Sequence, residues 1–127
     1  MDRHERLICK SADLADAGKG VRFRVNALGG AERGFVVRYG GHVRAYMNQC
    51  PHAFTELDWN PGEFFDDAAL YLICSTHGAL FDPSTGLCVA GPCRGAKLTS
   101  LPVCEREGEV FLLDDPPAED VKDKQAP

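Results

Sequence analysis

The chain has 127 residues, which suits one domain built around a single hydrophobic core. Its composition is ordinary for a globular protein, and no apolar run approaches the ~18 residues of a membrane span, so we expect no membrane partner. The net charge of −5 argues against nucleic acid as a partner. The first residues have mixed charge with no apolar stretch behind them, which predicts no secretory signal and a cytoplasmic location.

The first half of the chain predicts short β-strands separated by glycine turns. Residues 21–25 alternate apolar and basic side chains with a period of two, which is typical of a strand with one buried face. The glycine pairs at 29–30 and 40–41 mark turns, the second of them in a hairpin. A helical turn is expected at 11–14. The strands predicted in this half are 6–10, 21–25, 35–39 and 43–47.

The second half continues the pattern and ends in a polar tail. Its predicted strands are 71–74, 79–81, 98–104 and 110–113, and the set of about nine short strands with little helix predicts an all-β antiparallel sandwich or small barrel. Residues 1–113 are expected to form this single domain. Residues 114–127 are charged and carry three prolines, which predicts a disordered acidic and proline-containing tail.

Two short phrases carry the chemistry: Cys50-Pro51-His52 and Cys74-Ser75-Thr76-His77-Gly78. Each phrase supplies one thiol and one imidazole. A Cys2His2 zinc site is one alternative, although zinc fingers usually place a cysteine pair opposite a histidine pair. The arrangement that fits better is a [2Fe–2S] cluster with two cysteines on one iron and two histidines on the other.

The order Cys-x-His followed by Cys-x-x-His-Gly resembles the Rieske ferredoxin family. The resemblance implies an antiparallel β fold with an inserted cluster-binding subdomain, here about residues 48–95. It also implies that Cys50 and Cys74 bind the buried iron, and His52 and His77 the outer iron, of one [2Fe–2S] cluster. Further residues that the resemblance places around the cluster are Gly78 at a tight turn, Ala90-Gly91-Pro92 in a shielding third loop, and an apolar collar of Pro51, Ala53, Phe54 and Leu80.

The chain differs from the Rieske subunits of cytochrome bc complexes at positions that influence the reduction potential of the cluster. Thr55 and Thr76 stand where those subunits carry bridging cysteines. Ala79 and Phe81 stand where they carry a hydroxyl that donates to the cluster, which predicts a potential near about −150 mV rather than about +300 mV. The segment between the phrases is long for a ferredoxin, and we place the added residues within 57–70, including Trp59, Phe64 and Phe65.

These features favour a soluble one-electron carrier that passes electrons between a reductase and a terminal oxidoreductase such as an oxygenase. The alternatives are a cluster-bearing small subunit of a larger reductase complex, and an iron–sulfur or thiol redox sensor. Intrinsic oxygenase activity is disfavoured, because such enzymes need a separate mononuclear iron site and His4 and His42 are the only spare histidines.

Charge is divided unevenly along the chain. Residues 1–49 hold nine Lys/Arg and five Asp/Glu, whereas residues 50–93 hold six acids and no Lys or Arg. The acidic stretch is either a solvated surface or a docking face for a redox partner with a basic surface. For the second interpretation, the expected docking residues are Glu56, Asp58, Asp66 and Asp67.

Four cysteines fall outside the ligand phrases. Cys9 and Cys104 lie in strand-like segments and are expected to pack as small apolar groups. Cys88 and Cys93 are five residues apart and could be packing residues, a hairpin disulfide or a redox-sensitive pair. Two free thiols are favoured because a reducing compartment opposes a structural bridge.

Overall fold

The computed structural model describes residues 5–25, 33–51, 55–58, 60–74 and 78–113. Within these residues the chain forms antiparallel strands and one short 3-10 turn, which confirms the predicted all-β class. The predicted tail at 114–127 lies outside the described residues. In chain order the elements are β1 (Arg6–Lys10), η1 (Ser11–Asp13), β2 (Val21–Phe23), β3 (Gly34–Tyr39), β4 (His42–Met47), β5 (Leu72–Ile73), β6 (Leu80–Phe81), β7 (Cys88–Ala90), β8 (Val103–Arg106) and β9 (Glu109–Leu112).

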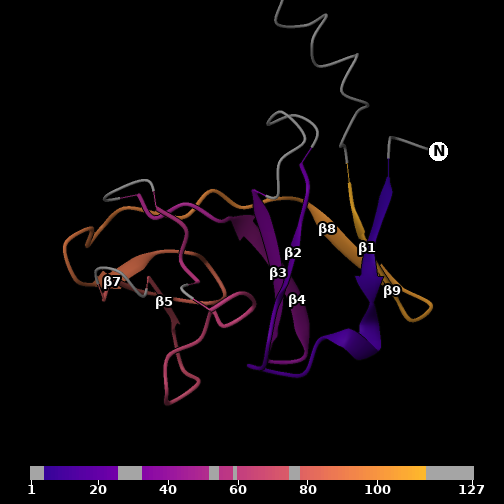
Figure 1. Cartoon of the computed structure of the whole chain (residues 1–127), viewed down its shortest axis with the longest axis horizontal. Helices are drawn as coiled ribbons and strands as arrows, with labels where there is room; N and C mark the ends of the chain where they lie inside the picture. The colour runs from indigo at the N-terminus through magenta and orange to yellow at the C-terminus, as the bar shows by residue number, and fades with distance from the viewer. Residues whose placement is uncertain (1–4, 26–32, 52–54, 59, 75–77, 114–127) are drawn as a thin grey trace, which may run out of the picture.

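The described strands form three three-stranded sheets, ordered β1-β9-β8, β2-β3-β4 and β5-β6-β7. The sheet β2-β3-β4 lies in the middle of the molecule, with β1, β8 and β9 on one side and β5 to β7 on the other (Figure 1). β5 and β6 flank the second ligand phrase, and β7 leads into the predicted third loop. The β5-β6-β7 sheet therefore lies within residues 48–95, the predicted cluster-binding subdomain.

The middle sheet separates two hydrophobic cores. Phe35 and Val37 on β3 pack into the core shared with β5 to β7, whereas Val36 between them packs with β1 and β9. All three side chains are fully buried, because successive residues of a strand point to opposite faces and both faces are covered. The run Phe-Val-Val is therefore the sequence signature of a strand buried on both sides.

The predicted strands agree with the observed ones in position but not in every boundary. The predicted strand 98–104 begins only at Val103, because the preceding residues leave the cluster-binding subdomain and run beside β4. There Met47 N–H donates to Thr99 O (2.8 Å) and Leu101 N–H donates to Ala45 O (2.9 Å). Strand β7 was not among the predicted strands.

One arginine joins three parts of the framework. The Arg38 guanidinium on β3 donates to both carboxylate oxygens of Glu105 on β8 (2.6 and 3.0 Å) and to the backbone oxygens of Leu14 and Gly41 (2.9 and 3.2 Å). These bonds fix β8 and the chain after η1 to the β3–β4 hairpin. Among the described residues, no helix has the length and apolar character that a membrane crossing requires.

Candidate metal centre

Two of the four predicted ligands lie buried at the base of neighbouring loops. Cys50 follows β4 and Cys74 follows β5, and both side chains are fully buried in the same hydrophobic core. The other two predicted ligands, His52 and His77, lie outside the described residues, as do Ala53, Phe54, Trp59 and Thr76.

Backbone hydrogen bonds close each ligand loop onto its own cysteine. In the first loop, Cys50 N–H donates to Thr55 O (2.7 Å). In the second, Cys74 N–H donates to Ala79 O (2.9 Å) and Gly78 N–H donates to Cys74 O (2.7 Å). Gly78 has φ of +72°, a conformation that glycine adopts without strain, so its place directly after His77 allows the chain to reverse.

A buried polar pair, Asn48 and Asp58, holds the two ends of the first loop together. Asn48 donates from its side-chain amide to Asp58 (2.9 Å) and accepts from Leu57 N–H through its carbonyl oxygen (2.8 Å). The second carboxylate oxygen of Asp58 accepts from Gly62 N–H (2.9 Å). Both side chains are about 5% exposed, and Asn48 is two residues before Cys50. The pair therefore fixes the backbone just before Cys50.

Thr55 brings a hydroxyl to the second ligand loop. Its Oγ1 lies 4.0 Å from the Sγ of Cys74. Sequence reasoning considered Thr55 only as the position of a missing bridge cysteine and did not identify it as a donor. A hydroxyl that approaches a ligand sulfur is a group that can stabilise added negative charge there.

The third loop packs closely on the second. A Cβ atom added at Gly91 would come within 2.8 Å of Ala79 Cα, and Gly91 has φ of +101°. Only glycine fits this contact, since any side chain would push the two loops apart. The loop 90–92 therefore lies against the second ligand loop.

The long segment between the ligand phrases joins the cluster-binding subdomain to the middle sheet. Phe64 is fully buried, and its ring stacks on Phe35 of β3 with centroids 3.9 Å apart and planes 11° apart. Phe65 lies 6.0 Å from Tyr39 by ring centroids. Aromatic pairs of this kind add to the stabilisation that comes from burial alone. Phe64 and Phe65 thus tie the added segment to the core.

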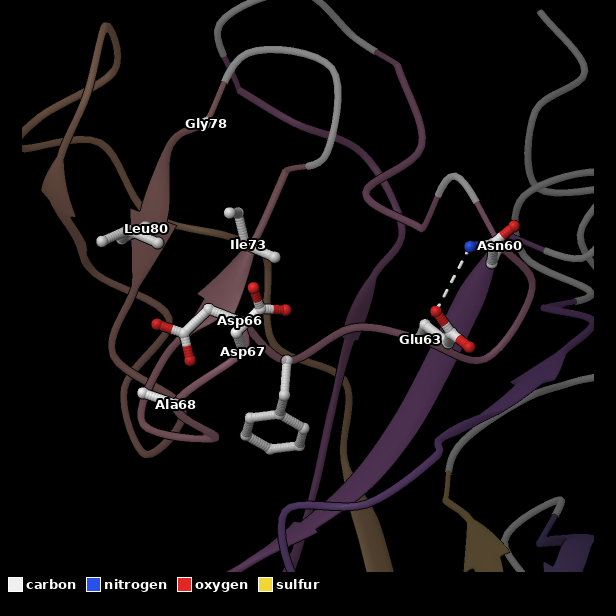
Figure 2. Close-up of a pocket in the computed structure, with 9 residues that line it drawn as sticks. Asn60, Glu63, Asp66, Asp67, Ala68, Ile73, Gly78 and Leu80 are labelled. Carbon is white, nitrogen blue, oxygen red and sulfur yellow. Dashed lines mark hydrogen bonds between the residues drawn. The ribbon is translucent and has the colours of Figure 1, made fainter.

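The outer side of the same segment forms an acidic cavity of about 670 Å³ beside the second ligand loop. Its carboxylates come from Glu63, Asp66 and Asp67, and its apolar wall comes from Ile73 and Leu80 (Figure 2). Gly78, the residue directly after His77, lies at its edge. Negative charge is therefore concentrated close to the loop that carries a predicted ligand.

The expectation that Asp58 belongs to a docking surface is wrong, because its side chain is buried in the pair with Asn48. Glu56 is exposed but forms an ion pair with Arg22 of β2 (2.5 Å), which also lies 3.8 Å from Asp58. Residues 50–93 contain no base, yet the fold brings one from the first half of the chain against these two acids. Of the four predicted docking residues, Asp66 and Asp67 line the acidic cavity.

The described part of the site fits a cluster held half by thiolates and half by imidazoles. Two buried cysteines on adjacent loops can bind one iron inside the protein, and a histidine follows each of them by two or three residues. The backbone bonds at the two loop bases close each loop on its own cysteine without using the sulfurs.

Comparisons with known proteins agree with this geometry. The family model described as "Rieske [2Fe-2S] domain" matches residues 4–105. The structure is similar to the ferredoxin of carbazole 1,9a-dioxygenase from Nocardioides aromaticivorans IC177, with 28% identity, a TM-score of 0.67, and coverage of 86% of this chain and 96% of that one. Comparison with curated proteins finds no match.

Similar folds also occur within longer chains. The terminal oxygenase of carbazole 1,9a-dioxygenase from the same organism is 26% identical with a TM-score of 0.70, covering 91% of this chain but 32% of that one. A chain in a complex of reduced oxygenase and oxidized ferredoxin in carbazole 1,9a-dioxygenase is 24% identical with a TM-score of 0.69, covering 90% and 96%. The chain thus spans nearly the whole length of the shorter relatives and about a third of the longer ones.

Proposed function

We infer that the chain, which belongs to the Rieske [2Fe–2S] domain family, is a one-electron carrier between a reductase and a terminal oxidoreductase. It holds one Rieske-type [2Fe–2S] cluster. The observation that carries the inference is the family match over residues 4–105 together with two buried cysteines at the bases of adjacent loops.

We propose that Cys50 and Cys74 bind one iron of the cluster and that His52 and His77 bind the other. The support is the burial of both cysteines and the position of each histidine shortly after them. When bound, the cluster supplies a site that accepts and returns one electron. In this proposal the four ligands hold the cluster in place. The loop around Gly91, which packs against Ala79, limits the access of water to the cluster.

We propose an oxygenase as the terminal partner. Two similarities support this proposal. One is to the ferredoxin of a carbazole dioxygenase, and the other is to a chain of a complex that contains both an oxygenase and a ferredoxin. The partner's docking surface is basic in this proposal, because the acidic cavity of Glu63, Asp66 and Asp67 borders the second ligand loop. We propose that the protein is located in the cytoplasm, because free thiols such as those of Cys88 and Cys93 persist in a reducing compartment.

The cluster itself is tested by analysis of freshly purified protein. We expect two irons and two acid-labile sulfides per chain, a visible spectrum typical of a Rieske centre, and reversible reduction by one electron. The variants His52→Cys and His77→Cys should shift the spectrum toward that of an all-cysteine centre. One zinc per chain without sulfide would disprove the proposal.

The acidic cavity is tested with small one-electron reagents of opposite charge. Hexaammineruthenium(III), a cation, should oxidise the reduced protein faster at low salt than at high salt, because opposite charges attract within a Debye length of about 8–10 Å. The double variant Glu63→Gln/Asp67→Asn should lose most of this salt dependence. Oxidation by hexacyanoferrate(III), an anion, should become faster in the same variant.

A matched control removes two negative charges that lie far from the acidic cavity. Glu107 and Glu109 lie in the β8–β9 hairpin, at the other end of the molecule from β5 to β7 (Figure 1). The double variant Glu107→Gln/Glu109→Gln has the same net charge as the cavity variant but should keep the salt dependence. Equal effects of the two variants would show that only net charge matters and would overturn the docking proposal.

A further inference from the structure

Two thiols outside the proposed ligand set lie against each other, one on each side of the third loop. The Sγ atoms of Cys88 and Cys93 are 3.0 Å apart, with Cys93 donating to Cys88. Cys88 begins β7, and Cys93 follows the exposed residues Gly91 and Pro92. Both cysteines are buried, Cys88 at about 1% and Cys93 at about 8% exposed.

The loop around the pair is fixed by backbone hydrogen bonds. Gly95 N–H donates to Cys88 O (3.0 Å), and Ala96 N–H donates to Cys93 O (2.9 Å). These bonds hold the two cysteines in register, so little chain entropy remains to oppose a bond between their sulfurs.

The pair is also close to the candidate metal centre. Cys88, Cys93 and Cys50 belong to one core cluster, and Cys93 interacts with Cys50 as well as with Cys88. A change in the thiol pair therefore takes place beside a proposed cluster ligand.

We propose that Cys88 and Cys93 form a reversible dithiol–disulfide couple, and that its state alters the adjacent cluster. The first part stands on the two thiols alone, and the second rests on the proposed function. A disulfide bond is about 2.05 Å long, so the two sulfurs need to approach by only about 1 Å. The oxidant class is a low-molecular-weight disulfide such as glutathione disulfide.

The exchange proceeds in two balanced steps. The Cys93 sulfur gives up its proton and attacks glutathione disulfide, which breaks the S–S bond and releases one glutathione. The Cys88 sulfur then gives up its proton and attacks the Cys93 sulfur, which forms the Cys88–Cys93 bond and releases the second glutathione. In total the protein loses two electrons and two protons, and glutathione disulfide becomes two thiols. Cys93 reacts first because it is the more exposed of the two.

The effect on the cluster follows from the rearrangement beside Cys50. Formation of the disulfide draws the Cys88 and Cys93 sulfurs together by about 1 Å, which alters the packing around the neighbouring Cys50. We therefore expect a shifted midpoint potential and an altered visible circular dichroism spectrum after oxidation.

The test equilibrates cluster-loaded protein for hours in glutathione buffers of graded ratio, because buried thiols exchange slowly. Acid quenching, alkylation and mass mapping then report the fraction of Cys88–Cys93 disulfide, while absorbance reports the cluster. We expect one intramolecular disulfide per chain in the most oxidising buffer, reversed by dithiothreitol. Cys88→Ala and Cys93→Ala should form no such bond, and Cys9→Ala serves as the matched control that should behave as the parent.

Each outcome decides one part of the proposal. An intact cluster without any Cys88–Cys93 disulfide in the most oxidising buffer overturns the couple. A disulfide that leaves both the potential and the dichroism unchanged overturns its effect on the cluster. A purified protein without iron or sulfide would contradict the proposed function instead, and in that case mass mapping still decides whether the disulfide forms.

Discussion

Removing the Asn48 side chain should release the first ligand loop. The variant Asn48→Ala loses one hydrogen bond to a carboxylate and one from a backbone N–H, and leaves Asp58 and Leu57 N–H buried without these partners. A hydrogen bond to a charged group contributes ~1.5–3 kcal/mol and a neutral one ~1 kcal/mol. We therefore expect a loss of about 3 kcal/mol, a large fraction of the ~5–15 kcal/mol that stabilises a domain.

The assay follows cluster loss in the presence of an iron chelator at a temperature well below unfolding. If cluster loss requires the first loop to open, a free energy of about 3 kcal/mol predicts loss about 100-fold faster than in the parent. The unfolding midpoint should fall by ~10–20 °C. Asp58→Asn should have a smaller effect of the same sign, because one oxygen of the side chain remains an acceptor.

A matched control uses the same substitution at an exposed asparagine. Asn60 donates to Glu63 at 3.3 Å and lies on the surface, so Asn60→Ala should change cluster loss less than twofold. The reasoning is refuted if Asn48→Ala retains its cluster as long as the parent does. It is also refuted if Asn60→Ala loses the cluster equally fast.

Three further predictions concern potential, acid stability and loop packing. The double variant Ala79→Ser/Phe81→Tyr should raise the midpoint potential in a redox titration, because it adds hydroxyl donors near the cluster. Arg38 lowers the pKa of Glu105 to about 2, so the ion pair stabilises the fold fully above the usual carboxyl pKa of ~4.5 and loses its effect as the pH falls toward 2. Urea unfolding should therefore show Glu105→Gln about 1 kcal/mol less stable at pH 7 and nearly equal to the parent at pH 2. Gly91→Ala should speed cluster loss, measured by the chelator assay, because its Cβ would meet Ala79.

Sequence periodicity predicted the fold class because the strands are short and bounded by glycine turns. The Gly40-Gly41 hairpin forms as predicted, with Tyr39 opposite His42 and both glycines at positive φ. The segment 98–104 was harder to predict, because its hydrogen bonds to β4 are tertiary and leave no period in the sequence. Strand ends depend on such contacts, which the local pattern does not encode.

The site could be predicted only for residues whose spacing in the sequence is typical of metal ligands. The two ligand phrases predicted the cysteines that the structure buries in one core, whereas Asn48 and Thr55 have no distinctive spacing and were not identified. Asp58 was assigned to the wrong role, because the acidic stretch gave no sign that its side chain is buried against Asn48. A charge run in sequence shows how many charges there are but not which of them face solvent.

The long segment between the ligand phrases contributes side chains both to the core and to the surface beside the site. Its inward side chains, Phe64 and Asp58, fix the cluster-binding subdomain to the middle sheet and to the base of the first loop. Its outward carboxylates, Asp66 and Asp67, face the acidic cavity. Asp66 also accepts from the N–H groups of Leu70 and Tyr71, directly before β5, which ends at the residue before Cys74. The same segment therefore fixes the chain on both sides of the site and places the charged cavity beside the second ligand loop.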